Sequence, residues 1–291
     1  MNPWKSFVLS LAICSLAAAQ ATRPATRPTA TQPAWHLNPN LPTIFLAGDS
    51  TAQVGDPLHT GWGKPFAAYV DPTKANWVNA ARGGRSSRTF ITEGWWDRIV
   101  ANLKPGDFVF IQFGHNDGGF VNDARAARGS LPGLGDETQE IDNLQTKQHE
   151  TVHTYGYYMR KMVEETKSRG ATPIMLSLTV RNIWTDGHVE RGSGHFDLWA
   201  RQIAVAEHVA FIDLTDMVAN RYEQLGQQAV AAFFPADHTH TAPAGAAINA
   251  QYVLAGVKAL NLPILQGLLS PAAQPIAPAT QPSVIQGQAG Q

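Results

Sequence analysis

The chain has 291 residues, of which 44% are apolar and 15% are charged, a composition typical of a globular protein with a sizeable core. Its net charge of -1 and its pI near 6.8 argue against a protein that binds nucleic acid or an anionic membrane surface, because such proteins carry a surplus of basic residues. We therefore expect no nucleic-acid partner and no membrane partner.

Residues 1–19 have the pattern of a signal peptide. Lys5 precedes the apolar run FVLSLAICSLAAA, and Ala17 and Ala19 supply an A-x-A cleavage site. The run is too short to span a bilayer comfortably. We expect the mature protein to be secreted or periplasmic, with a lipoprotein signal at Cys14 as the alternative. Cys14 is the only cysteine, so a mature chain without it has no thiol nucleophile, disulfide or cysteine-bound metal.

The rest of the chain divides by composition into three parts. Residues 20–40 are rich in proline, threonine and alanine and predict a linker. Residues 270–291 have a similar proline-, alanine- and glutamine-rich composition and predict a disordered tail. Residues 41–269 show neither an internal repeat nor a second linker, so they predict one domain.

Five short apolar runs in this domain predict buried parallel strands, because they are continuous rather than alternating. They are TIFLAG at 43–48, NWVNAA at 76–81, FVFIQFG at 108–114, PIMLSLTV at 173–180 and VAFIDL at 209–214. Helices are predicted over residues 95–103, 157–169, 195–207 and 244–260. Strands that alternate with helices indicate an α/β fold whose parallel sheet is covered on both faces.

In such folds ligands bind beyond the carboxyl ends of the strands. Each predicted strand is followed by polar residues, glycines or histidines. These segments are Gly48-Asp49-Ser50, residues 82–86, residues 114–117, Arg181-Asn182 and residues 235–240. Because the ends of parallel strands share one edge, we expect these segments to meet there.

Hydrolysis by a serine needs a hydroxyl, a base, a group that orients the base, and donors for the oxyanion. Ser50 ends the first strand without a complete G-x-S-x-G motif, and capping of a following turn is the alternative role for it. Asp237 and His240 are spaced so that a carboxylate can orient an imidazole. Asn116 and the backbone of Gly84 are candidate oxyanion donors, although both residue types also form ordinary turns.

The segment QHETVHTYG contains the H-E-x-x-H pattern of a zinc peptidase, with His149 and His153 as ligands and Glu150 as base. Met159 stands where a related pattern places a third histidine. The preceding segment is polar, whereas helices that bind zinc usually lie in a packed core. We therefore interpret the segment as the entry to the helix before the fourth strand, with a histidine that lines the substrate cleft as a further alternative.

Four blocks carry a resemblance to a known family. They are GDST at 48–51, GRSSRTF at 84–90, FGHNDGG at 113–119 and DHTHTAPAGA at 237–246. They resemble the blocks of SGNH (GDSL-type) hydrolases, and among these the rhamnogalacturonan acetylesterases. The resemblance extends over residues 41–265 and implies a three-layer α/β/α sandwich around a five-stranded parallel, flavodoxin-like sheet. Thr241-Ala242 replaces the more usual Thr-Ser, at positions without a catalytic role.

The resemblance also implies the roles of the site residues. Ser50 is the nucleophile, His240 the general base, and Asp237 the group that orients His240. The backbone N–H groups of Ser50 and Gly84 and the side-chain amide of Asn116 are the oxyanion donors. The implied enzyme is a monomer without a metal or cofactor, and it removes acetyl groups from a polysaccharide such as acetylated rhamnogalacturonan through an acetyl-serine intermediate.

Two residues are candidates for substrate binding. Arg85 lies in an arginine-rich loop after the second strand and is suited to pair with galacturonate carboxylates, although a solvated surface is the default for any arginine. Trp184 follows the fourth strand and is suited either to stack on a sugar ring or to pack in the core. Acetyl-xylan, a lipid or a thioester are alternative substrates, and a non-catalytic polysaccharide-binding module on the same scaffold is the alternative to an enzyme.

Overall fold

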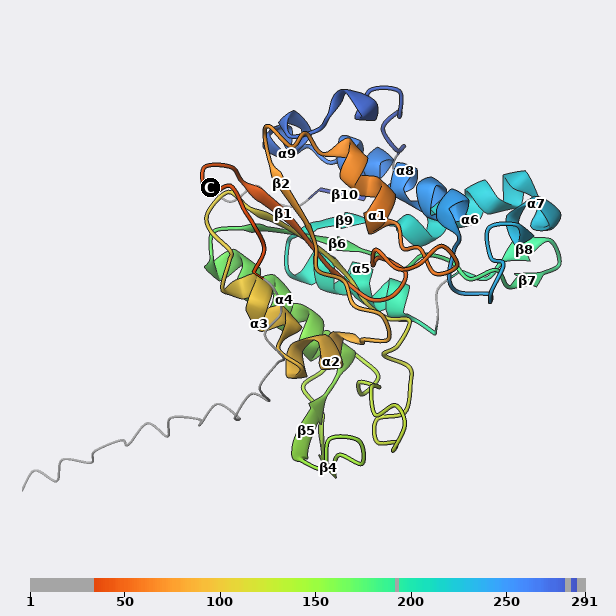
Figure 1. The fold of residues 1–291 in the computed structure, drawn as a ribbon. Helices are drawn as coiled ribbons and strands as arrows, with labels where there is room; N and C mark the ends of the chain where they lie inside the picture. The colour runs from red at the N-terminus through yellow and green to blue at the C-terminus, as the bar shows by residue number, and fades with distance from the viewer. Residues whose placement is uncertain (1–33, 192–193, 281–283, 287–291) are drawn as a thin grey trace, which may run out of the picture.

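The computed structural model describes residues 34–191, 194–280 and 284–286. The predicted signal peptide at residues 1–19 lies outside the described residues, and so does most of the predicted linker at 20–40. The described residues form a central sheet between two layers of helices (Figure 1).

The sheet has the strand order β10-β9-β6-β3-β1-β2. Its strands are β1 (Thr43–Gly48), β2 (Asn76–Asn79), β3 (Phe108–Gln112), β6 (Thr172–Leu176), β9 (Ala210–Ile212) and β10 (Val284–Ile285). The first five pair in parallel and correspond to the five predicted strands. Numbered among themselves they follow the order 2-1-3-4-5, so the predicted flavodoxin-like sheet is confirmed. β10 pairs antiparallel with β9 at the edge and was not predicted.

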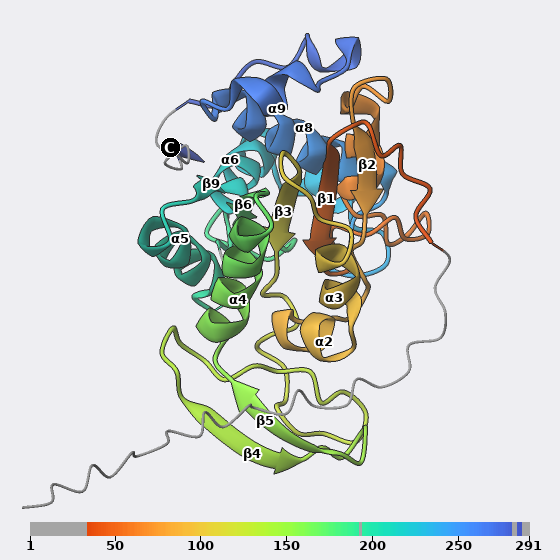
Figure 2. The same ribbon diagram turned by 90° about the vertical axis from the view of Figure 1, so that its left-hand side faces the viewer.

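Alternate residues of each strand enter two separate cores, because successive side chains point to opposite faces of a sheet. In β1, Ile44 and Leu46 belong to one core and Phe45 and Ala47 to the other. One face is covered by α2 (Ser87–Thr92), α3 (Trp95–Val100), α4 (Tyr155–Ser168) and α5 (Phe196–Ala206) (Figure 2). The other is covered by α1 (Gly63–Phe66), α6 (Leu214–Leu225), α7 (Gln227–Ala231), α8 (Pro243–Ala259) and α9 (Pro263–Gly267). The predicted three-layer sandwich is thus confirmed.

Two hairpins leave the sheet beyond the carboxyl ends of its strands. One consists of β4 (Thr138–Asp142) and β5 (His149–His153), and the other of β7 (Trp184–Thr185) and β8 (His188–Val189). In Figure 2 the arrows of β1, β2 and β3 point toward the end of the molecule from which β4 and β5 project, whereas α9 lies at the opposite end. The H-E-x-x-H residues themselves form strand β5, and the segment then enters α4 at Tyr155, so the expectation that it leads into the helix before the fourth strand is confirmed.

Residues 270–280, which we expected to be disordered, pack against α8. The Lys258 ammonium donates hydrogen bonds to the carbonyls of Ala273 (2.8 Å) and Ile276 (2.5 Å). Ala279 N–H donates to the carbonyl of Ala255 (2.8 Å). The folded part of the chain therefore extends beyond the predicted boundary at residue 269.

The predicted linker also contributes to the fold at its far end. The ring of Trp35 lies 5.6 Å from that of Phe45, and the guanidinium of Arg98 lies 3.9 Å above the Trp35 ring. The segment from residue 34 onward is therefore held on the surface of the helix layer that contains α3.

Candidate active site

Three predicted site residues come together at the carboxyl edge of the sheet. The Ser50 hydroxyl lies 2.8 Å from His240 Nε2, and His240 Nδ1 lies 2.7 Å from an Asp237 carboxylate oxygen. With Nδ1–H donating to Asp237, Nε2 is left to accept the hydrogen bond from the serine. A hydroxyl bonded to an imidazole that a carboxylate orients is the geometry that activates a serine for attack.

Asp237 keeps its charge through several hydrogen bonds. Its other oxygen accepts from the backbone N–H groups of Thr239 (2.6 Å) and His240 (2.7 Å). Partial burial opposes ionisation, but the hydrogen bonds from the His240 side chain and from these N–H groups outweigh it and lower the pKa of Asp237 to about 2. The Asp237 carboxylate therefore stays ionised throughout the neutral range and accepts the hydrogen bond from His240 Nδ1.

The turn that carries Ser50 is fixed by Asp49, which follows β1. One Asp49 oxygen accepts hydrogen bonds from the backbone N–H and the hydroxyl of Thr51, both at 2.9 Å. Asp49 and Ser50 are both buried. Beneath them lies His115, whose Nε2 is 3.2 Å from the Thr179 hydroxyl, and burial lowers the pKa of this imidazole. The hydrogen bonds of Asp49 to Thr51 thus fix the turn in which Ser50 lies.

The candidate oxyanion donors have free hydrogens. Among the described residues, no acceptor receives a hydrogen bond from the backbone N–H of Ser50 or of Gly84. Gly84 has φ of 74°, a left-handed conformation that glycine adopts without strain. Asn116 is buried, and its amide nitrogen donates to the carbonyl of Arg85 at 2.9 Å. That bond uses one of two amide hydrogens, so the second remains available for an oxyanion.

The loop that carries His240 is paired with residues 56–60, a segment that our sequence reasoning missed. Thr60 N–H donates to the carbonyl of Thr241, and the Thr241 hydroxyl donates to the carbonyl of Thr60, both at 2.8 Å. In the same segment His59 lies with its ring 5.2 Å from that of His240, edge to face. Among the described residues, His59, Asp237 and His240 form the group whose ligand atoms lie within 4.8 Å of one another and could hold a metal ion. No periodic pattern marks such a loop, so only the fold reveals it.

The loop after β3 is anchored to α2 by a buried carboxylate. Asp117 accepts hydrogen bonds from the Ser87 backbone N–H (3.1 Å) and from the Ser87 and Ser130 hydroxyls. Burial raises the pKa of Asp117 to about 7, in spite of the hydrogen bonds from Ser87. This connection fixes the neighbouring Asn116 relative to the loop that contains Gly84.

The two predicted substrate-binding residues have partners within the protein. Arg85 pairs with Glu93 (Nε to Oε2, 2.8 Å) and donates to the carbonyl of Gly83 at 2.9 Å. The Trp184 indole N–H donates to the side chain of Asn182 at 2.7 Å, and the ring is partly buried against the core. Packing in the core is thus part of the role of Trp184, while its exposed part stays available for a ligand.

The H-E-x-x-H residues do not form a zinc site. His149 and His153 lie four residues apart in the extended strand β5, a separation of about 13 Å along the strand, too far for both to bind one ion. The Glu150 carboxylate accepts two hydrogen bonds from the guanidinium of Arg88, both of 2.7 Å. The zinc-peptidase interpretation of this motif is therefore wrong for this structure.

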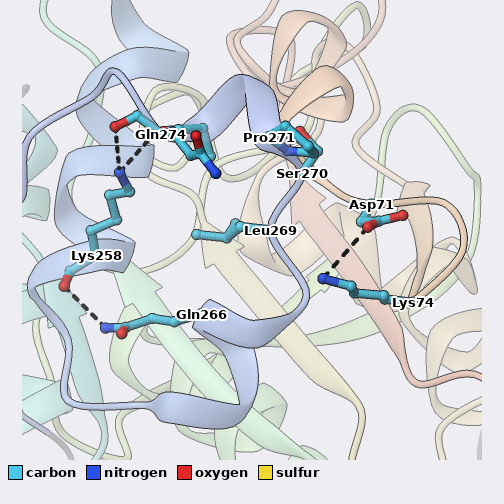
Figure 3. A pocket seen from close by; sticks show the side chains of 9 residues that line it. Asp71, Lys74, Lys258, Gln266, Leu269, Ser270, Pro271 and Gln274 are labelled. Carbon is cyan, nitrogen blue, oxygen red and sulfur yellow. Dashed lines mark hydrogen bonds and ion pairs between the residues drawn. The ribbon is translucent and has the colours of Figure 1, made fainter.

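A pocket opens at the other end of the molecule, where η2 (Pro271–Ala273) packs near the amino ends of the strands (Figure 3). It is lined by Asp71, Lys74, Lys258, Gln266, Leu269, Ser270, Pro271, Ala273 and Gln274. Its two lysines are engaged, since Lys258 donates to backbone carbonyls and Lys74 lies 3.6 Å from Asp71. None of the predicted site residues lines it.

Within the described residues, no helix has the length and apolar character needed to cross a membrane.

A three-layer α/β/α fold that brings a serine, a histidine and an aspartate into hydrogen-bond contact is typical of serine hydrolases. Comparison with known families identifies it further, since the sequence profile of the GDSL-like lipase/acylhydrolase family matches residues 46–248. The chain belongs to this family, as the four sequence blocks indicated.

Two proteins that are similar to this chain carry the names of rhamnogalacturonan acetylesterases. The chain is 36% identical over 215 residues to a rhamnogalacturonan acetylesterase from Emericella nidulans, across 74% of this chain and 84% of that protein. It is 28% identical over 233 residues to a probable rhamnogalacturonan acetylesterase, YesY, from Bacillus subtilis, across 78% of this chain and 97% of that protein.

Solved structures support the fold alone. The Bacillus subtilis protein YxiM superposes with a TM-score of 0.58 at 22% identity, covering 75% of this chain and 56% of that one. A variant of an acetyl-xylooligosaccharide esterase from Geobacillus stearothermophilus superposes with a TM-score of 0.52 at 19% identity, covering 73% of this chain and 92% of that one.

Proposed function

We propose that this protein is a carbohydrate esterase that removes O-acetyl groups from acetylated rhamnogalacturonan in plant cell-wall pectin. The observation that carries the proposal is the unbroken chain of hydrogen bonds from Ser50 through His240 to Asp237, at 2.8 and 2.7 Å. The relative from Emericella nidulans, which is named for this substrate, supports the choice of polysaccharide.

In the proposed mechanism Ser50 Oγ attacks the carbonyl carbon of the acetyl ester while His240 Nε2 takes the serine proton. The carbonyl oxygen becomes an oxyanion, which the N–H groups of Ser50 and Gly84 and the amide of Asn116 stabilise. His240 then gives its proton to the departing sugar oxygen, which leaves as a hydroxyl while the acetyl group stays on Ser50. A water molecule, deprotonated by His240, attacks this ester, releases acetate and restores the serine.

We also propose that residues 1–19 export the protein, so that it acts as a secreted or periplasmic monomer on a polymer outside the cytoplasm. The A-x-A pattern at Ala17 and Ala19 supports this proposal. Expression of the full chain in a bacterial host, with determination of the amino-terminal residue of the exported product, tests it. Retention of residues 1–19 on a cytoplasmic product would contradict it.

The catalytic proposal is tested with 4-nitrophenyl acetate and with acetylated rhamnogalacturonan, by following nitrophenol or acetate release. Ser50→Ala should lower kcat on both substrates by on the order of 10⁴-fold or more, because the nucleophile is lost. Acetyl-xylan serves as the competing polymer. Full activity of the Ser50→Ala variant would refute the mechanism, and faster turnover of acetyl-xylan than of acetylated rhamnogalacturonan would refute the substrate.

A further inference from the structure

Four arginines lie around the proposed oxyanion site, and the protein itself engages three of them. The Arg85 guanidinium is held by Glu93 and by the carbonyl of Gly83. Arg88 has a fully buried side chain paired with Glu150. The guanidinium of Arg82 lies over the ring of Trp95 at 4.3 Å.

The fourth is Arg128, from the long segment between β3 and β4. A Cβ placed on Gly84 would lie 3.5 Å from Arg128 Nη1, and one placed on Gly119 would lie 3.4 Å from Cγ and 3.6 Å from Nε. The side chain therefore lies across both glycines and reaches the backbone of Gly84. Gly119 is itself joined to the site, since its N–H donates to the carbonyl of Asn116 at 3.1 Å.

The backbone that carries this arginine is firmly held. Gly129 N–H donates to the carbonyl of Phe120 at 2.9 Å, and the Gly129 carbonyl accepts a hydrogen bond from the buried guanidinium of Arg88 at 2.7 Å. Arg128 N–H donates to the carbonyl of Ala126 at 2.9 Å. The base of the side chain is thus fixed relative to the loop that contains Asn116.

The guanidinium of Arg128 has no such partner. Within the part of the chain that the structure describes, it forms neither a hydrogen bond nor an ion pair, although the residue is only partly exposed. A guanidinium carries five N–H donors, and a partly buried one without acceptors is unfavourable until a ligand supplies them. Its planar fork matches a carboxylate, which it binds through two parallel hydrogen bonds.

We propose that Arg128 is a substrate-binding residue that pairs with a uronate carboxylate of the polysaccharide, within one sugar unit of the acetyl ester at Ser50. The proposal rests on the proposed function, because it takes Gly84 to mark the position of the reacting carbonyl. It assigns carboxylate recognition to Arg128 instead of Arg85, whose fork is already used by Glu93. The enzyme then selects acetyl esters on acidic polymers over those on neutral ones.

The experiment compares acetylated rhamnogalacturonan that has free carboxylates with the same polymer after methyl esterification. For each enzyme the quantity measured is the ratio of kcat/KM on the two polymers. The wild-type ratio should be about 10 to 100 in favour of the free carboxylate, as expected for loss of a charge-assisted pair. Arg128→Gln should bring the ratio to about one, mainly through a higher KM on the free acid, and Arg128→Lys should leave an intermediate ratio, because an ammonium lacks the planar fork.

Arg125→Gln is the matched control, since Arg125 is an exposed arginine of the same segment and should leave the ratio at its wild-type value. A ratio that persists in Arg128→Gln, or a wild-type ratio near one, would overturn the proposal. A merely structural role of Arg128 would slow both polymers equally and leave the ratio unchanged. Failure of the catalytic proposal is separate, because it would appear as retained activity in Ser50→Ala whatever the ratio.

Discussion

Glu150 offers a direct test of what the H-E-x-x-H segment does in this protein. Its carboxylate accepts three hydrogen bonds of 2.7 Å, two from the guanidinium of Arg88 and one from the amide of Asn143. Burial opposes ionisation of Glu150, but these hydrogen bonds outweigh it and hold its pKa below the ordinary value. The Arg88 side chain is 0% exposed and has no access to water. We therefore expect this ion pair to serve stability rather than metal chemistry.

The change Glu150→Gln removes the charge at nearly constant shape and leaves Arg88 buried without a counter-charge. Breaking a buried pair in this way costs about 3 to 5 kcal/mol, and the partial exposure of Glu150 places it near the lower end. For a domain of this size, 1 kcal/mol shifts the melting temperature by about 2 to 4 °C, so we expect a decrease of about 6 to 12 °C. Thermal unfolding followed by circular dichroism measures this decrease.

His149→Ala is the matched control in the same motif. His149 is exposed and lies 3.0 Å from both Glu140 and Asp142, and exposed ion pairs of this kind contribute little to stability. This variant should melt close to the wild type and retain wild-type activity on 4-nitrophenyl acetate. A zinc mechanism predicts the opposite pattern. Loss of turnover in His149→Ala, or an unchanged melting temperature in Glu150→Gln, would refute the structural role.

The remaining predictions concern the proposed catalytic residues and their charges. Asn116→Ala should lower kcat on 4-nitrophenyl acetate by about 10²- to 10³-fold through loss of one oxyanion donor, and an unchanged kcat would exclude the amide from that role. Asp237→Asn should lower kcat by about 10⁴-fold, and because the pKa of Asp237 is about 2, the acid limb of the wild-type pH–rate profile should contain no step from this carboxylate above pH 4. Added Zn²⁺ should inhibit the enzyme reversibly, because His59, Asp237 and His240 can bind the ion together. A chelator alone should leave the rate unchanged. Inhibition by Zn²⁺ that survives His59→Ala would contradict this prediction. Folding raises the pKa of Asp117 from 3.8 to about 7, so the contribution of Asp117 to stability is complete below pH 4 and is lost as the pH rises to 7. Asp117→Asn should therefore flatten the pH dependence of the free energy of unfolding in urea between pH 4 and 7. An unaltered slope would refute the assignment.

The sequence predicted the sheet well because its strands are buried on both faces. A strand such as β3, with all five residues buried, appears as a continuous apolar run bounded by polar residues. Helix α6 was missed although its signals are present. Asp213 caps its first turn by accepting from Asp216 N–H at 3.2 Å, and Leu214, Met217 and Val218 form its buried face. The run VAFIDL was assigned to a strand up to residue 214, which concealed the cap.

The hairpin of β4 and β5 was less accessible to sequence reasoning. Each strand has one buried residue, Ile141 in β4 and Val152 in β5, so no apolar alternation marks them. The H-E-x-x-H spacing is also compatible with a helix when considered by itself. What decides its conformation is the pairing of His149 with Asp142 and of His153 with Thr138, a contact between segments that no local pattern encodes.

Three of the proposed catalytic residues were predictable because their positions follow from topology. Ser50, Gly84 and Asn116 each come just after a strand, and parallel strands bring their carboxyl ends to one edge. Which arginine has a free guanidinium does not follow from topology. Arg85 and Arg128 are equivalent on composition, and only the position of Glu93 beside Arg85 distinguishes them.

This difference suggests how catalysis and substrate choice are separated in the molecule. Ser50, Gly84 and Asn116 lie on connections at the ends of buried strands, so a change in the sheet would displace them together. Arg128 lies instead on the long segment between β3 and α4, which α2 holds through Arg88 by its bonds to the carbonyls of Val121 and Gly129 and to Glu150. Substitutions in that segment can therefore alter which polymer is bound while the Ser50–His240 distance stays the same, provided that the buried Arg88 keeps its acceptors.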